Sequence, residues 1–249
     1  MIKLQPQSFL SRIGFAVDSE LSLIESVVAY GLPTLLAITL HEAAHGYVAY
    51  LFGDPTAKNL GRLSLNPIRH IDLVGTILLP AMLKLAGSPF LFGWAKPVPV
   101  DARHFRRPRQ DMMWVAAAGP AMNLFLAMAS ARLMFVVESL PAAYQNITQA
   151  TLEISLVINV LLGVLNMLPI PPLDGGKVLV GLLPAGAARR LAQVEKYGML
   201  PMLLLLVGLP MLGGAIGVNL NPVGWVVLTV SDWIVQLIAS LSGLSASGG

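Results

Sequence analysis

Long apolar runs alternate with short polar loops along most of this sequence. A helix that crosses a membrane needs about 20 predominantly apolar residues. Runs of that length cover residues 29–52, 112–137, 150–172, 198–218 and 222–244. A shorter sixth run follows the first of them. The pattern predicts an all-α polytopic membrane protein with about five to six transmembrane helices.

The composition supports this assignment. Apolar residues make up 55% of the chain and charged residues only 12%, whereas a soluble domain has roughly 25% charged residues. The absence of cysteine excludes disulfides, cysteine-ligated zinc and thiol nucleophiles. The net charge of +3 is small, and no basic surface interleaved with aromatic residues is evident. The lipid bilayer is therefore an expected partner and nucleic acid is not.

We expect a single integral-membrane domain, because no repeat and no appended soluble domain is apparent. This domain covers residues 1–249, with its core at about 29–176 and additional helices in 198–244. The Ser/Gly-rich residues 245–249 are predicted to form a flexible tail.

Lysine and arginine are concentrated in three loops. The basic loops are 53–71, 93–111 and 173–197, whereas 139–149 and 219–222 contain neither residue. The positive-inside rule places the basic loops in the cytoplasm and the neutral ones outside. The run 112–137 then leads outward and 222–244 returns inward, which puts the C-terminal tail in the cytoplasm. The chain is thus predicted to be a multi-pass protein of the cell (inner) membrane.

The sixth apolar run, 73–92, does not fit this scheme as a simple span. It contains Lys84 and is interrupted by Pro80, Gly87 and Pro89. If the basic loops before and after this run are both cytoplasmic, the run cannot be a single crossing of the membrane. We expect a re-entrant or surface-lying element here, or a short β element, between the first and second spans.

The motif His41-Glu42-Ala43-Ala44-His45 lies inside the first apolar run. Residues four apart share one face of a helix, so both imidazoles can reach one ion. Glu42 lies about 100° around the helix from His41, where its carboxylate can approach a metal-bound water. An acid at membrane depth costs about 2.5 kcal/mol or more, and a divalent metal would compensate. The alternative is two histidines near a helix end, solvated at the membrane interface.

A catalytic zinc takes three protein ligands, so a third ligand is needed. Asp174 is the candidate, because it follows the apolar run 150–172 at the end predicted to be cytoplasmic. His45 is near the end of its own apolar run that is predicted to lie on the same side. Prolines break the helix before Asp174, and the two glycines after it permit a tight turn that could swing the carboxylate inward. The alternative is a solvated aspartate in an Asp-Gly turn.

Four stretches of the chain resemble the site-2 protease family of intramembrane zinc metalloproteases, in its compact prokaryotic form without a PDZ or other soluble domain. They are ITLHEAAHGYVAYLFGDPTAKNLGRLSLNP (38–67), FGWAKPVPVD (92–101), AAGPAMNLFLA (117–127) and NVLLGVLNMLPIPPLDGG (159–176). The resemblance implies one zinc ion bound by His41, His45 and Asp174, and a water activated by Glu42. It also implies substrates that are membrane proteins with a transmembrane helix.

The same resemblance directs attention to three asparagines. In the family an asparagine at the position of Asn123 lies near the active site, so Asn123 could hold substrate or donate to an oxyanion. A helix-packing role is the alternative. Asn159 and Asn166 lie on the helix that leads to Asp174. Either could orient a metal ligand, and we expect Asn166 to act at the site and Asn159 to be structural.

The predicted function is hydrolysis of peptide bonds in or near transmembrane segments by a zinc metalloendopeptidase whose site opens to the cytoplasm. The alternatives are a non-catalytic metal-binding membrane protein and a divalent-metal transporter. The other two histidines, His70 and His104, lie in polar loops, where we expect them to be solvated.

Overall fold

The computed structural model describes residues 22–70, 72–78, 82, 85 and 96–244. Within these ranges the structure is helical and contains no strand, which confirms the all-α prediction. Four helices in the described ranges are long and apolar enough to cross a membrane. They are α2 (Leu23–Leu51), α5 (Pro108–Leu133), which continues into the 3₁₀ segment η4 (Met134–Ser139), α6 (Ala142–Asn166) and α11 (Pro222–Ser242).

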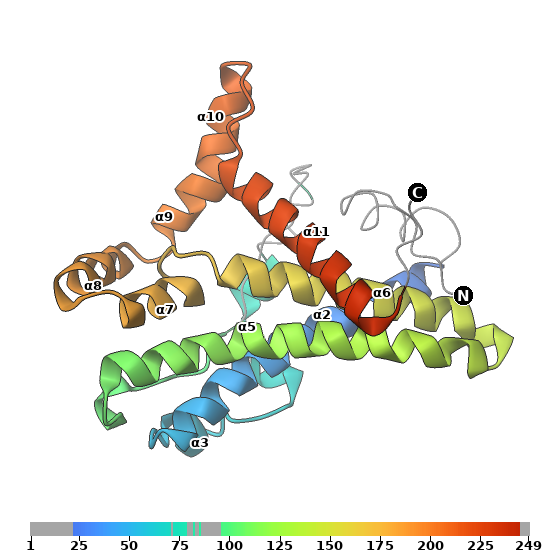
Figure 1. Ribbon diagram of the computed structural model, residues 1–249, viewed down its shortest axis with the longest axis horizontal. Helices are drawn as coiled ribbons and strands as arrows, with labels where there is room; N and C mark the ends of the chain where they lie inside the picture. Colours follow the sequence, from blue (N-terminus) through green and yellow to red (C-terminus); the bar gives the residue numbers. More distant parts are fainter. Residues whose placement is uncertain (1–21, 71, 79–81, 83–84, 86–95, 245–249) are drawn as a thin grey trace.

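Shorter helical elements connect and extend these four (Figure 1). They are α3 (Thr56–Asn59), η1 (Pro67–His70), η2 (Leu73–Leu78), η3 (Ala102–His104), α7 (Asp174–Leu182), α8 (Ala185–Ala192), η5 (Gln193–Tyr197), α9 (Leu200–Leu203), η6 (Leu204–Gly208) and α10 (Leu209–Ala215). A bent pair, Ala185–Tyr197 and Leu200–Ala215, would count as a fifth span. Five spans would match the lower end of the predicted five to six, and four to five candidate spans fit a polytopic membrane protein.

Local chemistry sets the ends of the long helices. Ser22 caps α2 by accepting from the Glu25 N–H, and the Glu25 carboxylate accepts from the Ser22 N–H, which starts the helix before the predicted residue 29. Helix α6 ends at Asn166, earlier than predicted, because prolines follow at positions 169, 171 and 172 and cannot continue the hydrogen-bond ladder.

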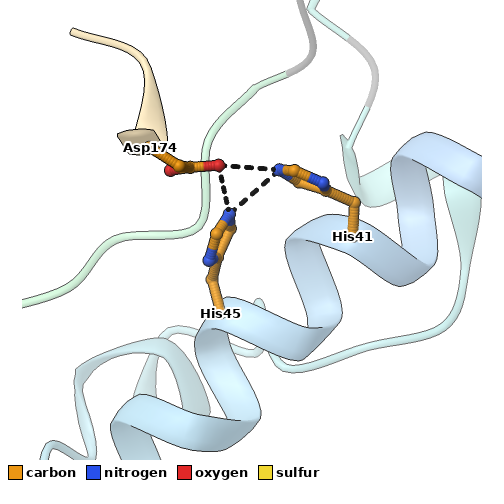
Figure 2. Close-up of side chains that lie close together, drawn as sticks. All are labelled: His41, His45 and Asp174. Atoms are coloured by element: carbon orange, nitrogen blue, oxygen red, sulfur yellow. Dashed lines mark hydrogen bonds and ion pairs between the residues drawn. The ribbon is translucent and has the colours of Figure 1, made fainter. Parts of the chain in front are cut away.

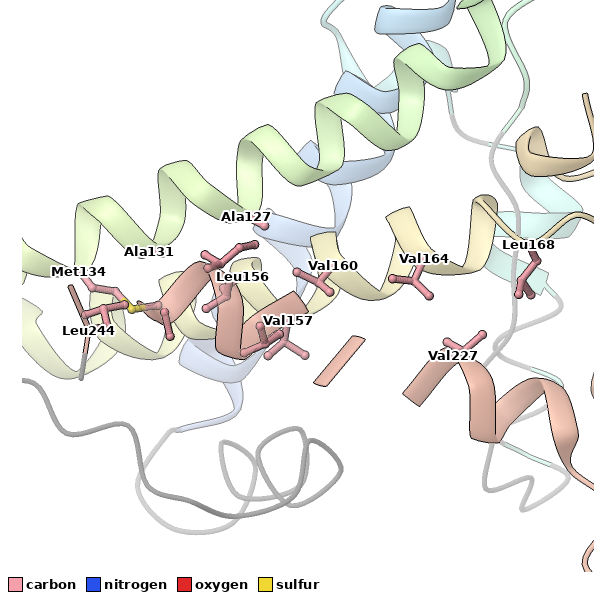
Figure 3. Packing of buried hydrophobic residues seen from close by; sticks show 13 residues of the cluster. Ala127, Ala131, Met134, Leu156, Val157, Val160, Val164, Leu168, Val227 and Leu244 are labelled. Atoms are coloured by element: carbon pink, nitrogen blue, oxygen red, sulfur yellow. The ribbon is translucent and has the colours of Figure 1, made fainter. Parts of the chain in front are cut away.

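Helices α2, α5 and α6 pack against one another, and α5 also packs against α7 (Figure 1). A core of buried side chains joins α5, η4, α6 and α11, including Ala131, Met134, Val160 and Val227 (Figure 3). Because α5 runs antiparallel to both α2 and α6, the C-terminal ends of α2 and α6 lie beside the N-terminal end of α5. The three basic loops therefore meet at one end of the bundle.

Helix α11 runs in the direction opposite to the one predicted. Near its C-terminal end the Leu241 carbonyl accepts from Arg132, and Ser242 contacts Met128, both on α5. Near its N-terminal end Val227 lies beside Leu168 at the other end of the bundle (Figure 3). Thus α11 is parallel to α5 and ends far from the basic loops, so the structure does not support a C-terminal end on their side.

The cause lies in the preceding segment, which was predicted to cross the membrane over 198–218. The chain bends by 80° between Tyr197 and Leu200, where Gly198 has φ 58° and Pro201 occupies the first turn of α9. Helices α9 and α10 project away from the bundle (Figure 1). The predicted re-entrant or β element at 73–92 lies largely outside the described residues; the described part begins with a π-helical turn, η2.

Candidate metal centre

His41 and His45 lie one turn apart on α2 and face Asp174 at the first residue of α7 (Figure 2). The Nε2 atoms of the two histidines are 3.0 Å apart, and each is 3.2 Å from Asp174 Oδ2. All three side chains are buried. The structure therefore brings together the three residues that the sequence proposed as metal ligands.

The other ring nitrogens of the histidines identify the proton-bearing atoms. Asn123 Oδ1 lies 2.6 Å from His41 Nδ1, and the Val115 carbonyl oxygen lies 2.7 Å from His45 Nδ1. Both oxygens can only accept, so each Nδ1 carries the hydrogen and each neutral Nε2 presents a lone pair. Two lone pairs and a carboxylate oxygen then converge with no hydrogen between them. Such an arrangement is suited to a metal ion.

The donor set and its spacing fit zinc. Two imidazole nitrogens and one carboxylate oxygen are a ligand set of catalytic zinc sites, which keep a fourth position open. Ligands about 2.1 Å from a tetrahedral zinc are about 3.4 Å from one another. The observed separations of 3.0–3.2 Å are close to that value. No other group of three such residues converges in the described part of the chain.

Glycines make room for this centre. A Cβ on Gly119 would lie 2.5 Å from His45 Nε2 and 2.6 Å from His41 Nε2, so no other residue fits there without moving the imidazoles. A Cβ on Gly175 would lie 2.2 Å from the Met167 carbonyl oxygen. That close approach lets α7 begin against the end of α6 and points Asp174 at α2.

Glu42 is half-buried and contacts the extended segment 96–100. Its Oε2 accepts a 2.7 Å hydrogen bond from the Val98 N–H. The segment is held in turn by Arg62, which donates to the Lys96 carbonyl at 2.9 Å. These contacts fix one oxygen of the carboxylate and leave Oε1 for another partner.

Asn123 lies beside the metal group, and Asn159 and Asn166 differ in what they contact. Asn123 is fully buried, accepts from His41 and directs its amide nitrogen at Asn159 Oδ1 (2.9 Å) and the Ala37 carbonyl (3.4 Å). Both amide hydrogens are thus engaged, which favours orientation of His41 over donation to an oxyanion. Asn166 donates to Leu162 on its own helix at 3.0 Å. Asn159, expected to be structural, is the one in contact with Asn123.

The remaining histidines do not join the metal group. His104 is half-exposed and its Nδ1 lies 3.1 Å from Asp54 Oδ1. His70 was expected to be solvated, but only 2% of it is exposed, and its Nε2 lies 2.8 Å from the Ser64 carbonyl. The backbone carbonyl of His70 also accepts a hydrogen bond from the Lys96 N–H, which ties this residue to the segment before α5.

An apolar groove of about 690 Å³ lies between α2, α5 and the loop around residue 64. Its walls are the side chains of Leu40, Ala44 and Tyr47 on α2 and Ala121 and Phe125 on α5, among others. Ala44 directly precedes His45. The groove therefore borders the helix that carries the metal-binding motif.

Comparison with known proteins identifies a family and several relatives. A model of peptidase family M50 matches residues 130–209, which include Asp174. Several relatives carry the name "Putative zinc metalloprotease", and two of them illustrate the similarity. YwhC of Bacillus subtilis is 41% identical over 187 residues, covering 73% of this chain and 82% of YwhC. Rip2 of Mycolicibacterium smegmatis is 30% identical over 177 residues, covering 70% of this chain and 64% of Rip2.

No solved structure gives a significant match to the chain. The relationship to YwhC nevertheless extends over most of both proteins, and it accompanies a family match and a converging His–His–Asp group. On these grounds the chain belongs to peptidase family M50, the site-2 protease family.

Proposed function

We propose that this protein is an intramembrane zinc endopeptidase that cuts peptide bonds in or near transmembrane segments of other membrane proteins. The observation that carries the proposal is the convergence of two imidazole lone pairs and one carboxylate, from His41, His45 and Asp174, in a chain built of membrane-length helices. Family membership supports the same reading.

His41, His45 and Asp174 would hold the zinc ion, whose chemistry is to polarise a scissile carbonyl and lower the pKa of a bound water. Asn123 and the Val115 carbonyl hold the imidazoles with their Nε2 lone pairs directed inward. Because the residues are buried, little bulk water competes for their lone pairs.

Glu42 is the proposed general base. Its Oε1 takes a proton from the attacking water as the water oxygen bonds to the scissile carbon, and it delivers that proton to the leaving nitrogen when the carbon–nitrogen bond breaks. The hydrogen bond from the Val98 N–H holds Oε2 and so fixes the direction of Oε1.

The apolar groove beside α2 supports an apolar substrate. A transmembrane segment that has unwound near the metal would place its side chains along the groove, where Phe125 and Tyr47 offer apolar surface. A helix hides its peptide bonds in internal hydrogen bonds, so glycine or proline in the substrate should favour cutting.

We further propose that the protein lies in the inner membrane of a bacterial cell and that its site opens to the cytoplasm. The argument is that the basic loops gather at the end of the bundle that holds the metal group. The chain contains no cysteine, so single cysteines report sidedness without background. A cysteine at exposed Arg103 should be labelled only after the membrane is permeabilised, whereas one at exposed Tyr144 should be labelled in intact cells. The reverse pattern would overturn this orientation.

The test of the whole proposal compares wild type, His45→Ala and Glu42→Gln, purified without chelators. Wild type should contain about one zinc per chain by elemental analysis, His45→Ala should contain little, and Glu42→Gln should keep the metal. In a separate experiment in cells, each of the three proteins is co-expressed with tagged single-span proteins whose spans contain glycine or proline. Only wild type should release a fragment cut within or beside the span.

The outcomes separate the alternatives. A wild-type protein that contains about one zinc per chain but cleaves no reporter, like Glu42→Gln, would favour a non-catalytic metal-binding protein. Zinc accumulation in proteoliposomes would favour a transporter, which needs a path of several sites. The described residues offer a single group, so we expect no uptake.

A further inference from the structure

A chain of hydrogen bonds leads from His41 into the interior of the helix bundle. His41 Nδ1 bonds Asn123 Oδ1 at 2.6 Å, and Asn123 Nδ2 donates to Asn159 Oδ1 at 2.9 Å. Asn159 Nδ2 in turn donates to the Ser155 carbonyl at 2.9 Å, one turn earlier on α6. The chain thus joins α2, α5 and α6.

The two amides are enclosed by protein. Asn123 is 0% exposed and Asn159 is 1% exposed, so the bonds they make with protein groups decide how they are oriented. The fixed point is the Ser155 carbonyl, which can only accept. It holds the Asn159 NH₂ group on its side and therefore turns Asn159 Oδ1 toward Asn123.

This orientation passes to the metal centre. With Asn159 Oδ1 in front of it, Asn123 must present its NH₂ group there and its oxygen to His41. His41 must then carry its hydrogen on Nδ1 and keep a lone pair on Nε2. A rotated Asn123 amide would present N–H to His41 and favour the opposite tautomer, in which the hydrogen occupies the metal-binding atom.

We propose that Asn159 is a positioning residue of the metal centre, which sets the tautomer of His41 through the amide of Asn123. The inference rests on the proposed zinc site, not on proteolysis. The 3.4 Å contact of Asn123 Nδ2 with the Ala37 carbonyl is a second, longer anchor, so loss of Asn159 weakens the orientation without abolishing it.

The experiment measures zinc affinity by competition with a fluorescent chelator, on full-length protein in detergent. Asn159→Leu keeps the branched shape of the side chain and removes the acceptor, and zinc affinity should fall about threefold to tenfold. Asn159→Asp should recover most of it, because a buried neutral carboxylic acid offers one acceptor and one donor, as the amide does. Asn159→Ala serves if the leucine variant does not fold.

Ser155→Ala is the matched control. Its hydroxyl lies 3.4 Å from Asn159 Nδ2 and 2.8 Å from the Ser130 hydroxyl, so the substitution removes a polar atom from the same helix. It leaves the Ser155 carbonyl, and hence the orientation of Asn159, in place. Zinc affinity should stay within about twofold of wild type, below the effect of one lost hydrogen bond.

A double-mutant cycle shows whether Asn159 acts through Asn123. In an Asn123→Leu background, Asn159→Leu should cause no further loss of affinity. An equal additional loss, or unchanged affinity in Asn159→Leu, would overturn the inference while leaving the zinc site intact. Wild type that binds no zinc would overturn the proposed metal site itself, and the inference with it.

Discussion

Two buried aspartates, Asp54 and Asp174, each follow a long helix at the basic end of the bundle, yet their surroundings are opposite. Asp54 follows α2 and is 0% exposed; Asp174 follows α6 and is 7% exposed. By burial alone the two carboxylates are alike. The groups that face them differ.

Asp54 is surrounded by hydrogen-bond donors. Its Oδ1 accepts from the Thr56 N–H at 3.0 Å and from the Thr56 hydroxyl, and its Oδ2 accepts from the Asp101 N–H at 2.7 Å. His104 adds a contact of 3.1 Å. The carboxylate therefore ties the turn after α2 to the segment before α5, and its charge is balanced without any ion.

Asp174 instead faces two imidazole nitrogens whose hydrogens lie on the far side of their rings. Lys177 is no closer than 4.0 Å, at the other carboxylate oxygen. Buried charge without donors is unfavourable unless a cation joins it. The contrast teaches that the chemistry of the neighbours, and not burial, separates a structural aspartate from a ligand.

Replacing Asp174 with asparagine should produce the largest effect. A ligand is lost, so zinc affinity should fall by more than about 100-fold, the upper end for loss of an outer-shell partner. The amide NH₂ group can donate to the lone pairs that remain, so the metal-free variant should fold. Chelator competition gives the affinity. Addition of chelator should lower the thermal unfolding midpoint of wild type and leave that of Asp174→Asn unchanged.

An equal response of both proteins to chelator would mean that Asp174 resembles Asp54 after all. Asp54→Asn, examined in parallel, is the control for loss of a buried carboxylate at this end of the bundle. It should keep the chelator response of wild type.

Gly119→Ala should have the next largest effect. The added methyl would lie 2.5–2.6 Å from ring atoms of both histidines, so the rings must move from their present positions. We expect zinc affinity to fall about 10-fold to 100-fold, as when a metal ligand loses its orientation. Gly163→Ala is the matched control, because its methyl would lie 3.6 Å from its nearest neighbours. Equal affinities in the two variants would contradict the geometry of the centre.

The sequence predicted the helical class and most of the spans because membrane burial requires apolar length, which can be read directly. It did not predict the direction of α11. The chain bends by 80° between Tyr197 and Leu200, and a hydropathy pattern contains no information on bends. Helix α6 ended early for a reason that was visible, namely the prolines after Asn166.

The site was predictable where local spacing determines geometry. His41 and His45 need only a helix to converge. Asp174 reaches them only if the end of α6 lies beside α2, and the sequence alone does not position these two helices. The exchange of expected roles between Asn159 and Asn166 has a similar cause. The two differ by seven residues, about two turns, so they lie near the same helix face, and only their depth decides which one reaches Asn123.

Asp54→Ala should affect stability and not the metal. The substitution leaves the Thr56 and Asp101 N–H groups without their acceptor, at a cost of about 1–3 kcal/mol in the free energy of unfolding. Zinc affinity should stay within about twofold of wild type. Denaturant unfolding in detergent measures the first quantity and chelator competition the second. Asp101→Ala is the milder comparison, because its partner Arg103 is 90% exposed and exposed ion pairs contribute little. A large loss of zinc in Asp54→Ala would mean that the two aspartates are coupled.

The smallest expected effect is a change in acid sensitivity. Burial opposes ionisation of Asp54, but the hydrogen bonds from Thr56 and Asp101 and the charge of His104 outweigh it, so the pKa of Asp54 lies below its ordinary value. A carboxyl with a lowered folded-state pKa stabilises the fold above its unfolded pKa of about 3.9, and this contribution is lost as the pH falls through the folded pKa. The unfolding midpoint should therefore drop on acidification below about pH 4, and Asp54→Asn should flatten that drop. Both proteins are compared in an Asp174→Asn background, where acid release of zinc makes no contribution. Identical slopes would show that the donors around Asp54 do not favour its charged form.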